Sequence, residues 1–133
     1  MKQRRNFLSA VALALLAAAL PASAAEDIVI GQVAPFSGPQ AVTSKAIYTG
    51  AKLYFDAVNE RGGVRGRAIR LVTRDDAQKP EESVRLTREL ISAEAPLALI
   101  GTVGTANLEA LDKDGVLTQQ RVSMIGAVSG AAS

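Results

Sequence analysis

Short runs rich in apolar residues, the first of them β-branched, alternate along this chain with longer segments of helical periodicity, and that alternation constrains its fold most. Runs of this kind are typical of strands that are buried on both faces of a parallel sheet. They predict strands at residues 28–33, 68–73, 97–100 and 122–127. Strand and helix in strict alternation, with short connections, indicate right-handed βαβ units. The predicted fold class is therefore α/β, a parallel sheet with flanking helices.

Three helices are predicted between these strands. The first spans 43–61 and ends at Gly62-Gly63, because glycine readily takes the left-handed conformation that closes a helix. The second opens at Pro80, where a missing N–H is tolerated, and the third runs from Ala106 to about Gln119 with a break near Gly115. The apolar face of the first helix is expected to contain Ile47, Gly50, Ala51, Tyr54, Ala57 and Val58.

Residues 1–24 have the three parts of a secretory signal peptide. Basic residues come first, an apolar run follows at 7–20, and small residues at an A-x-A spacing end at Ala24. A membrane-spanning helix needs about 20 apolar residues, more than this run has. We therefore expect export, cleavage after Ala24 and no membrane insertion afterwards. The segment Arg4-Arg5-Asn6-Phe7-Leu8 resembles a twin-arginine export motif. Twin-arginine and ordinary secretory export both remain open.

The residue inventory excludes several classes of chemistry. The 133 residues contain no His, Cys or Trp, so zinc fingers, thiol nucleophiles, Ser-His-Asp triads and disulfides are excluded. Apart from the three basic residues of the leader, 12 of the 15 basic residues remain against 13 acidic ones, so no nucleic-acid partner is predicted. The glycines at 101–106 have the wrong spacing for a dinucleotide fingerprint, and no cofactor is predicted.

Candidate binding residues follow the strands, because ligands of open parallel sheets lie beyond the carboxyl ends of the strands. The turn at 101–107 is the best anion cradle among them. Thr105 is either the N-cap of its helix or a hydroxyl donor to a ligand, and the amides of Thr105 and Ala106 belong to the unpaired first turn. Asp75 and Asp76 form a carboxylate pair, for which we favour a structural role, accepting backbone hydrogen bonds, over a metal or acid–base role.

Several segments, in order and at a specific spacing, form a recognisable signature that covers essentially the whole chain after the leader. They are Gly31 with Ser37-Gly38-Pro39, Thr49-Gly50-Ala51, Asn59 to Gly66, Asp75-Asp76, Ile100 to Thr105 and Ile125 to Ala131. The most specific part is the double glycine with its downstream Gly66, followed by the Asp-Asp pair ahead of Pro80. Together these segments resemble the type I periplasmic solute-binding proteins of the branched-chain amino acid transport family.

This resemblance implies a two-lobed periplasmic protein that captures a small amino acid or amide and delivers it to the membrane permease of an ABC transporter. It implies that Thr105, with Gly104 and Ala106, holds the carboxylate of the ligand. It further implies that the backbone of Val128, Ser129 and Gly130 meets the charged end of the ligand, and that Ser37 lies in a loop that borders it.

The sequence also departs from this family. Thr43-Ser44 stands where several relatives have an aromatic residue followed by glycine, so no aromatic wall for the ligand is predicted. Family members are far longer, so residues 25–133 are expected to form an incomplete N-terminal lobe that binds ligand weakly or not at all by itself. Two alternatives stay open: an extracellular ligand-sensing module of a receptor, and a secreted nucleotide-binding enzyme domain.

Overall fold

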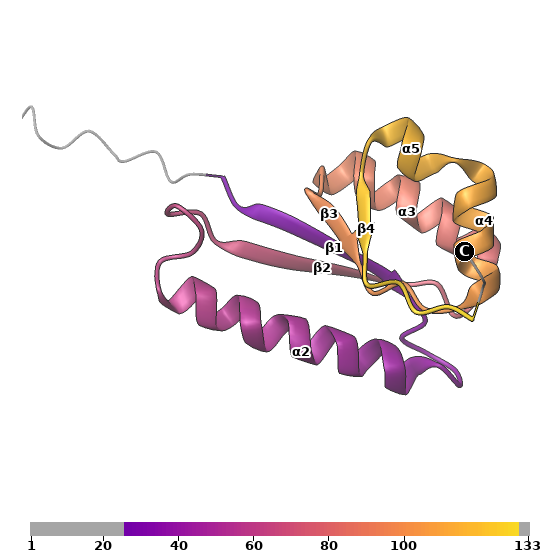
Figure 1. Cartoon of the computed structure of the whole chain (residues 1–133), viewed down its shortest axis with the longest axis horizontal. Coiled ribbons are helices and arrows are strands. Elements are labelled where there is room, and N and C mark those ends of the chain that lie inside the picture. The colour runs from indigo at the N-terminus through magenta and orange to yellow at the C-terminus, as the bar shows by residue number, and fades with distance from the viewer. Residues whose placement is uncertain (1–25, 131–133) are drawn as a thin grey trace, which may run out of the picture.

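A computed structural model describes residues 26–130 (Figure 1), and the predicted leader lies outside the described residues. Its four strands are all parallel and form one sheet in the order β2-β1-β3-β4, which confirms the predicted parallel α/β class. The strands are β1 (Ile28–Ala34), β2 (Ile69–Asp75), β3 (Ala98–Ile100) and β4 (Ser123–Ile125). The helices are α2 (Ala41–Glu60), α3 (Pro80–Glu94), α4 (Thr105–Asp114) and α5 (Val116–Gln120).

The central strand β1 faces a helix on each side. Successive strand residues point to opposite faces, so Gly31 and Gln32 face different helices. A methyl group at Gly31 would lie 2.7 Å from a Leu90 methyl of α3, whereas Gln32 Nε2 donates to the Ser44 carbonyl of α2 at 3.5 Å. Helix α2 thus covers one face, and α3 packs closely on the other because Gly31 has no side chain.

The core lies on the α3 face of the sheet. Its buried members are Val33, Leu86, Leu90 and Leu99, and Leu90 and Leu99 are fully buried. Partly buried side chains pack around them: Val72, Leu117, Val122 and Met124. Strands, α3 and α5 therefore share one apolar cluster.

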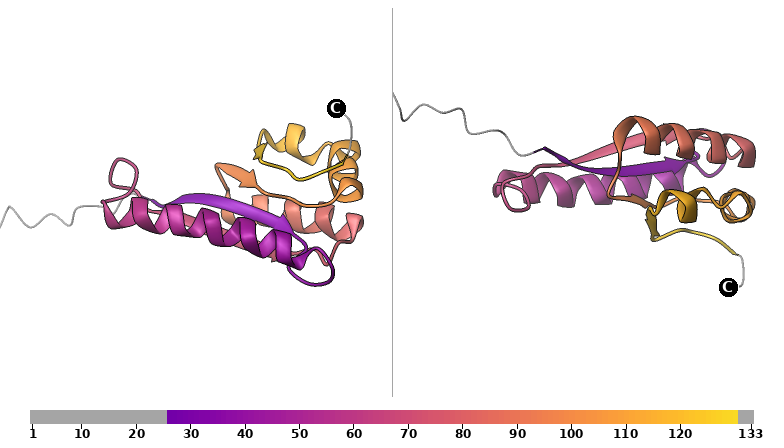
Figure 2. Two further views of the ribbon diagram at one scale, coloured as in Figure 1. Left: turned by 60° about the horizontal axis from the view of Figure 1, so that its bottom comes forward. Right: turned by 90° about the horizontal axis from the view of Figure 1, so that it is seen from above.

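The α2 face of the sheet is only partly covered. In Figure 2, α2 follows β1 and β2, while β3 and β4 lie away from it. Ser44 is the one buried residue of α2, and Tyr54, expected on its apolar face, is 65% exposed. Ile125 of β4 is 60% exposed. The periodicity predicted the helix correctly, but it did not predict that Tyr54 would be exposed.

Two element ends differ from the predictions, and strand pairing explains one of them. Arg74 and Asp75 were expected in a loop but complete β2, because Ala34 at the end of β1 pairs with Asp75. Helix α2 begins two residues earlier than predicted, at Ala41. The break near Gly115 is confirmed: its φ of 73° ends α4 and starts α5.

Asn59 joins the end of α2 to the start of β2. Its Nδ2 donates to the carbonyl of Ile69 at 2.9 Å, and its Oδ1 accepts from the N–H of Ile69 at 2.7 Å. The amide therefore bonds both backbone groups of one residue, as a neighbouring peptide unit would. This pair of bonds gives Asn59, part of the segment that carried the family resemblance, a structural role.

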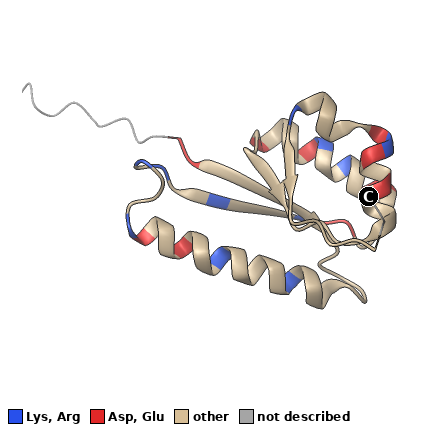
Figure 3. Ribbon diagram, in the orientation of Figure 1, with Lys and Arg blue, Asp and Glu red and all other residues tan. Residues whose placement is uncertain are grey.

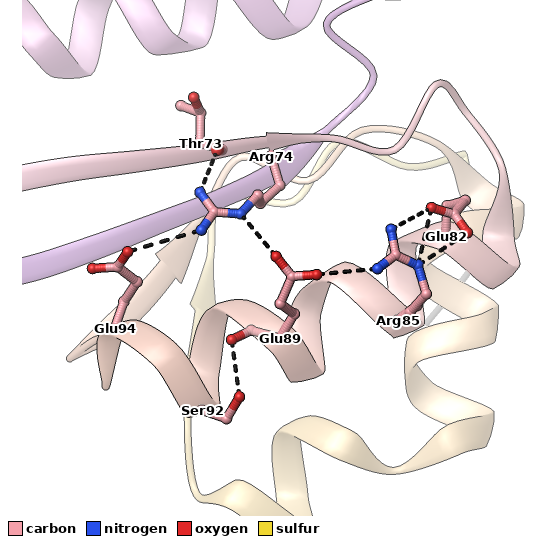
Figure 4. Close-up of polar contacts among 7 residues, drawn as sticks. All are labelled: Thr73, Arg74, Glu82, Arg85, Glu89, Ser92 and Glu94. Atoms are coloured by element: carbon pink, nitrogen blue, oxygen red, sulfur yellow. Dashed lines mark hydrogen bonds and ion pairs between the residues drawn. The ribbon is translucent and has the colours of Figure 1, made fainter.

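Strand β2 is an edge of the sheet, and charges line it. Acidic and basic residues alternate along α3 (Figure 3), and ion pairs join α3 to Arg70 and Arg74 of β2. Arg74 lies 3.5 Å from Glu89 and 3.8 Å from Glu94, and Glu89 also pairs with Arg85 at 3.0 Å (Figure 4). Half-exposed pairs contribute little stability individually. Charged side chains on an edge strand do, however, oppose pairing with another chain.

Candidate functional site

Hydrogen bonds from the buried side chains of Thr102 and Gln32 fix the turn between β3 and α4. Thr102 is fully buried, and its hydroxyl donates to the carbonyl of Val33 at 2.9 Å. Gln32 Nε2 donates to the Gly101 carbonyl at 3.3 Å. Helix α4 begins at Thr105, with Gly104 as N-cap at a φ of 117° and with no side-chain cap. The capping role considered for Thr105 is therefore not observed, and the Thr105 hydroxyl is available for other contacts.

The segment after β4 runs beside this turn. Val128 forms a parallel bridge with Val103, donating its N–H to the Thr102 carbonyl at 2.9 Å and accepting from the Gly104 N–H at 3.0 Å. Gly130 N–H donates to Thr105 Oγ1 at 3.0 Å. Two chain segments predicted from the sequence to share a site are thus hydrogen-bonded to each other.

Most of the predicted site residues gather here. Thr105, Gly104 and Ala106 come from the start of α4, and Val128, Ser129 and Gly130 come from the parallel segment, where Ser129 Oγ lies 3.5 Å from Thr105 Oγ1. A hydroxyl that accepts one hydrogen bond keeps its own proton to donate. The first-turn amides of α4 add donors and the positive end of the helix dipole. This arrangement suits an anionic group such as a carboxylate.

Ser37 lies elsewhere on the same edge, with Asp75. Asp75 Oδ1 accepts from the N–H groups of Phe36 at 2.9 Å, Ser37 at 3.3 Å and Ala77 at 2.9 Å. These bonds tie the loop after β1 to the end of β2. Partial burial acts to raise the pKa of Asp75, but the hydrogen bonds from Ala77, Ser37 and Phe36 outweigh it and hold the pKa below its ordinary value.

The lowered pKa of Asp75 predicts a loss of stability in acid. A carboxylate whose pKa is lower in the folded state stabilises the fold above the unfolded pKa of about 3.9, and this contribution disappears as the pH falls through the folded pKa. In urea unfolding between about pH 5 and pH 2.5, the free energy of unfolding should therefore fall less steeply with decreasing pH in Asp75→Asn than in the parent chain. Asp112→Asn, the same chemical change on the exposed surface of α4, is the matched control. Parallel slopes for Asp75→Asn and the parent would contradict the assignment.

Asp76 has a structural role, as favoured from the sequence. It is fully buried, its Oδ1 accepts from the Gln78 N–H at 2.9 Å, and its Oδ2 accepts from Asn107 Nδ2 at 2.9 Å and from the Ser83 hydroxyl. Within residues 26–130 no group of three acidic, His or Cys side chains is placed to hold a metal ion. Sequence reasoning singled out neither Ser83 nor Asn107, because only the fold brings their helices together.

A hollow on the surface lies at the opposite edge of the sheet, where the strands begin. It is lined by Asp27, Val29, Arg67 and Leu97, among others. Arg67 already donates there to the carbonyls of Glu26 and Asp27, at 2.6 and 3.3 Å. Ligands of parallel sheets bind at the carboxyl ends of strands, so we place the candidate site at the Thr105 turn.

Comparison with known proteins shows the family of this chain. Residues 27–133 match the family model described as periplasmic binding protein. The chain belongs to the periplasmic binding protein family. A Leu/Ile/Val-binding protein homolog 7 from Brucella suis biovar 1 (strain 1330) is 34% identical over 125 residues, 94% of this chain and 31% of the relative. The predicted family resemblance is thereby confirmed.

Solved periplasmic binding proteins share the fold. The crystal structure of a substrate-binding periplasmic protein from Ralstonia solanacearum is 50% identical, with a TM-score of 0.76 over 79% of this chain and 30% of that one. A branched-chain amino acid transporter substrate-binding protein from Streptococcus pneumoniae, solved with isoleucine, is 25% identical with a TM-score of 0.71 over 80% and 30%. The chain thus corresponds to the N-terminal portion of a type I periplasmic binding protein and spans about a third of its relatives' length. In the described part, no helix has the length and apolar character to cross a membrane.

Proposed function

We propose that this chain contributes one wall of the ligand cleft in an exported substrate-binding protein of an ABC transporter. The ligand class is a branched-chain amino acid or a related small amino acid or amide. In this proposal residues 1–24 are a signal peptide, and residues 25–133 are part of the N-terminal lobe. The protein works in the periplasm and passes its ligand to a membrane permease. It is a binding protein and not an enzyme, in keeping with the names of its relatives.

One observation carries the proposal: the exposed convergence of two segments at Thr105. The hydroxyl of Thr105 accepts the Gly130 N–H at 3.0 Å, and the helix that begins there has no side-chain cap. The carboxylate common to all amino acids would receive the Thr105 O–H and first-turn amides, with the helix dipole in its favour. Ala106, Val128, Ser129 and Gly130 are exposed, so this edge is accessible. We assign Ser37 to the border of the cleft, at the neighbouring strand end.

A chimaera tests the role of Thr105 in a complete cleft. Residues 27–130 replace the matching third of the Ralstonia solanacearum protein, which is 50% identical to this chain. Calorimetry first measures binding of leucine, isoleucine, valine and small amides to the chimaera. Thr105→Val removes the hydroxyl but keeps the side-chain shape, and it should weaken binding about tenfold or more, the expected loss of a hydrogen bond to a charged group.

The matched control is Thr49→Val, which makes the same chemical change on the exposed surface of α2. It should leave the dissociation constant unchanged. A chimaera that melts cooperatively and binds none of the panel would contradict the proposed ligand class. Equal affinities for Thr105→Val and the unsubstituted chimaera would contradict the assignment of the carboxylate to this turn.

A further inference from the structure

Three buried polar side chains meet beneath the start of α4. Asp76 follows β2, Ser83 lies in the first turns of α3, and Asn107 lies in the first turn of α4; none is more than 1% exposed. Asn107 Nδ2 donates to Asp76 Oδ2 at 2.9 Å and to Ser83 Oγ at 2.6 Å, while the Ser83 hydroxyl donates to Asp76 Oδ2. We call these three residues the buried polar cluster.

Joining two helices through this cluster carries an unfavourable desolvation free energy. Burial of an ionised carboxylate is unfavourable unless hydrogen bonds replace its hydration. None of the ion pairs among the described residues includes Asp76, so donated hydrogen bonds from Gln78, Ser83 and Asn107 carry the compensation. Apolar side chains of similar size would hold α3 and α4 together without that cost. Directional bonds differ from apolar contacts in that they fix the rotation of a helix about its axis.

Asn107 places one member of the cluster next to Thr105. Asn107 lies two residues after it, and Asn107 Oδ1 is 3.3 Å from where a Cβ on Gly104 would stand. Gly104 in turn accepts the first helical hydrogen bond, from the Leu108 N–H at 3.1 Å, and donates to Val128 at 3.0 Å. The orientation of the Asn107 side chain therefore bears on both ends of the turn that presents the Thr105 hydroxyl.

We propose that Asp76, Ser83 and Asn107 are positioning residues, which set the direction of the first turn of α4 and so the aim of the Thr105 hydroxyl. Their relevance to ligand rests on the function proposed above for this turn. They touch no ligand in this proposal. They act by holding α4 in one rotation against α3, so that its first-turn amides and the Thr105 hydroxyl point to a fixed place on the edge of the sheet.

A charge-and-amide swap tests the proposal without a ligand. Asp76→Asn places two amide donors opposite each other, and Asn107→Asp places two carboxylates together. The double variant restores every partner: Asn at 76 accepts from Gln78 and donates to Asp at 107, which also accepts from Ser83. Hydrogen exchange of the full chain should show protection at Leu108, Gly104 and Val128 falling about tenfold or more in each single variant, relative to α2 amides. The double variant should return to within about threefold of the parent.

The control separates positioning from general stability. Leu86→Ala weakens the apolar core without touching a hydrogen bond of the cluster, so its loss of protection should extend over the sheet and helices together. A failure of the double variant to recover would overturn the proposal, as would single variants whose losses spread evenly as in Leu86→Ala. Because the exchange measurement contains no ligand, its outcome is independent of the ligand class proposed above. Calorimetry on the chimaera reports that class separately.

Discussion

Replacement of Gly63 by alanine is expected to lower the free energy of unfolding by about 3 kcal/mol or more, through left-handed strain and a backbone clash together. Gly63 has a φ of 72°, and a Cβ there would stand 2.1 Å from the carbonyl oxygen of Arg67. That oxygen accepts from the Val64 N–H at 2.8 Å, within the turn that leads into β2. The turn must open to admit the methyl group. Urea unfolding followed by circular dichroism measures the loss.

Gly66→Ala is the matched control for this prediction. Gly66 has nearly the same φ, 78°, but nothing lies within 4 Å of the position of its Cβ. Its substitution should cost only the left-handed strain, about 1–2 kcal/mol. The difference between the two variants therefore isolates the clash with Arg67. Equal losses in Gly63→Ala and Gly66→Ala would show that this close approach does not constrain the turn.

Leu90→Ala is expected to cost about 2–5 kcal/mol, the range for a leucine removed from a close-packed core. Leu90 is fully buried on α3, and its methyl groups fill the space above Gly31. The resulting cavity would lie against the central strand, where the surrounding elements have little freedom to collapse. Equilibrium urea unfolding gives the difference in free energy directly, and the thermal midpoint should fall in parallel.

Leu53→Ala makes the same chemical change on α2, where Leu53 is 67% exposed. Substitutions on exposed surface usually stay within about 0.5 kcal/mol. The prediction for Leu90 fails if the two variants lose similar stability, because that result would show that Leu90 contributes no more to the fold than an exposed leucine.

The order and direction of the elements followed from local patterns because those patterns have local causes. The β-branched run at β1 and the proline that opens α3 each act within a few residues. Gly115 stops a helix by its own backbone conformation. The strand ends were harder to predict from the sequence, because Asp75 belongs to β2 only through its pairing with Ala34.

The sequence predicted which segments converge at the candidate site, but not the side-chain hydrogen bonds that hold them. The rule that ligands lie beyond the carboxyl ends of parallel strands brought the Thr105 turn and Gly130 to one edge, and they are hydrogen-bonded there. The same rule placed Ser37 at that edge without showing its bond to Asp75. Asn107 gave no local signal, because its partners lie 24 and 31 residues away in the sequence.

The position of β1 between two strands that come later in the sequence affects when its backbone can pair. Ile28 pairs with Ile69 on one side of β1, and Ile30 pairs with Ala98 on the other. The central strand is therefore synthesised before both of its partners, and its backbone groups stay unpaired until each later segment arrives. Such long-range pairing is slow and leaves apolar strands open to aggregation while it is incomplete. In the proposed export of this chain, the interval between synthesis and folding would be when β1 most needs protection.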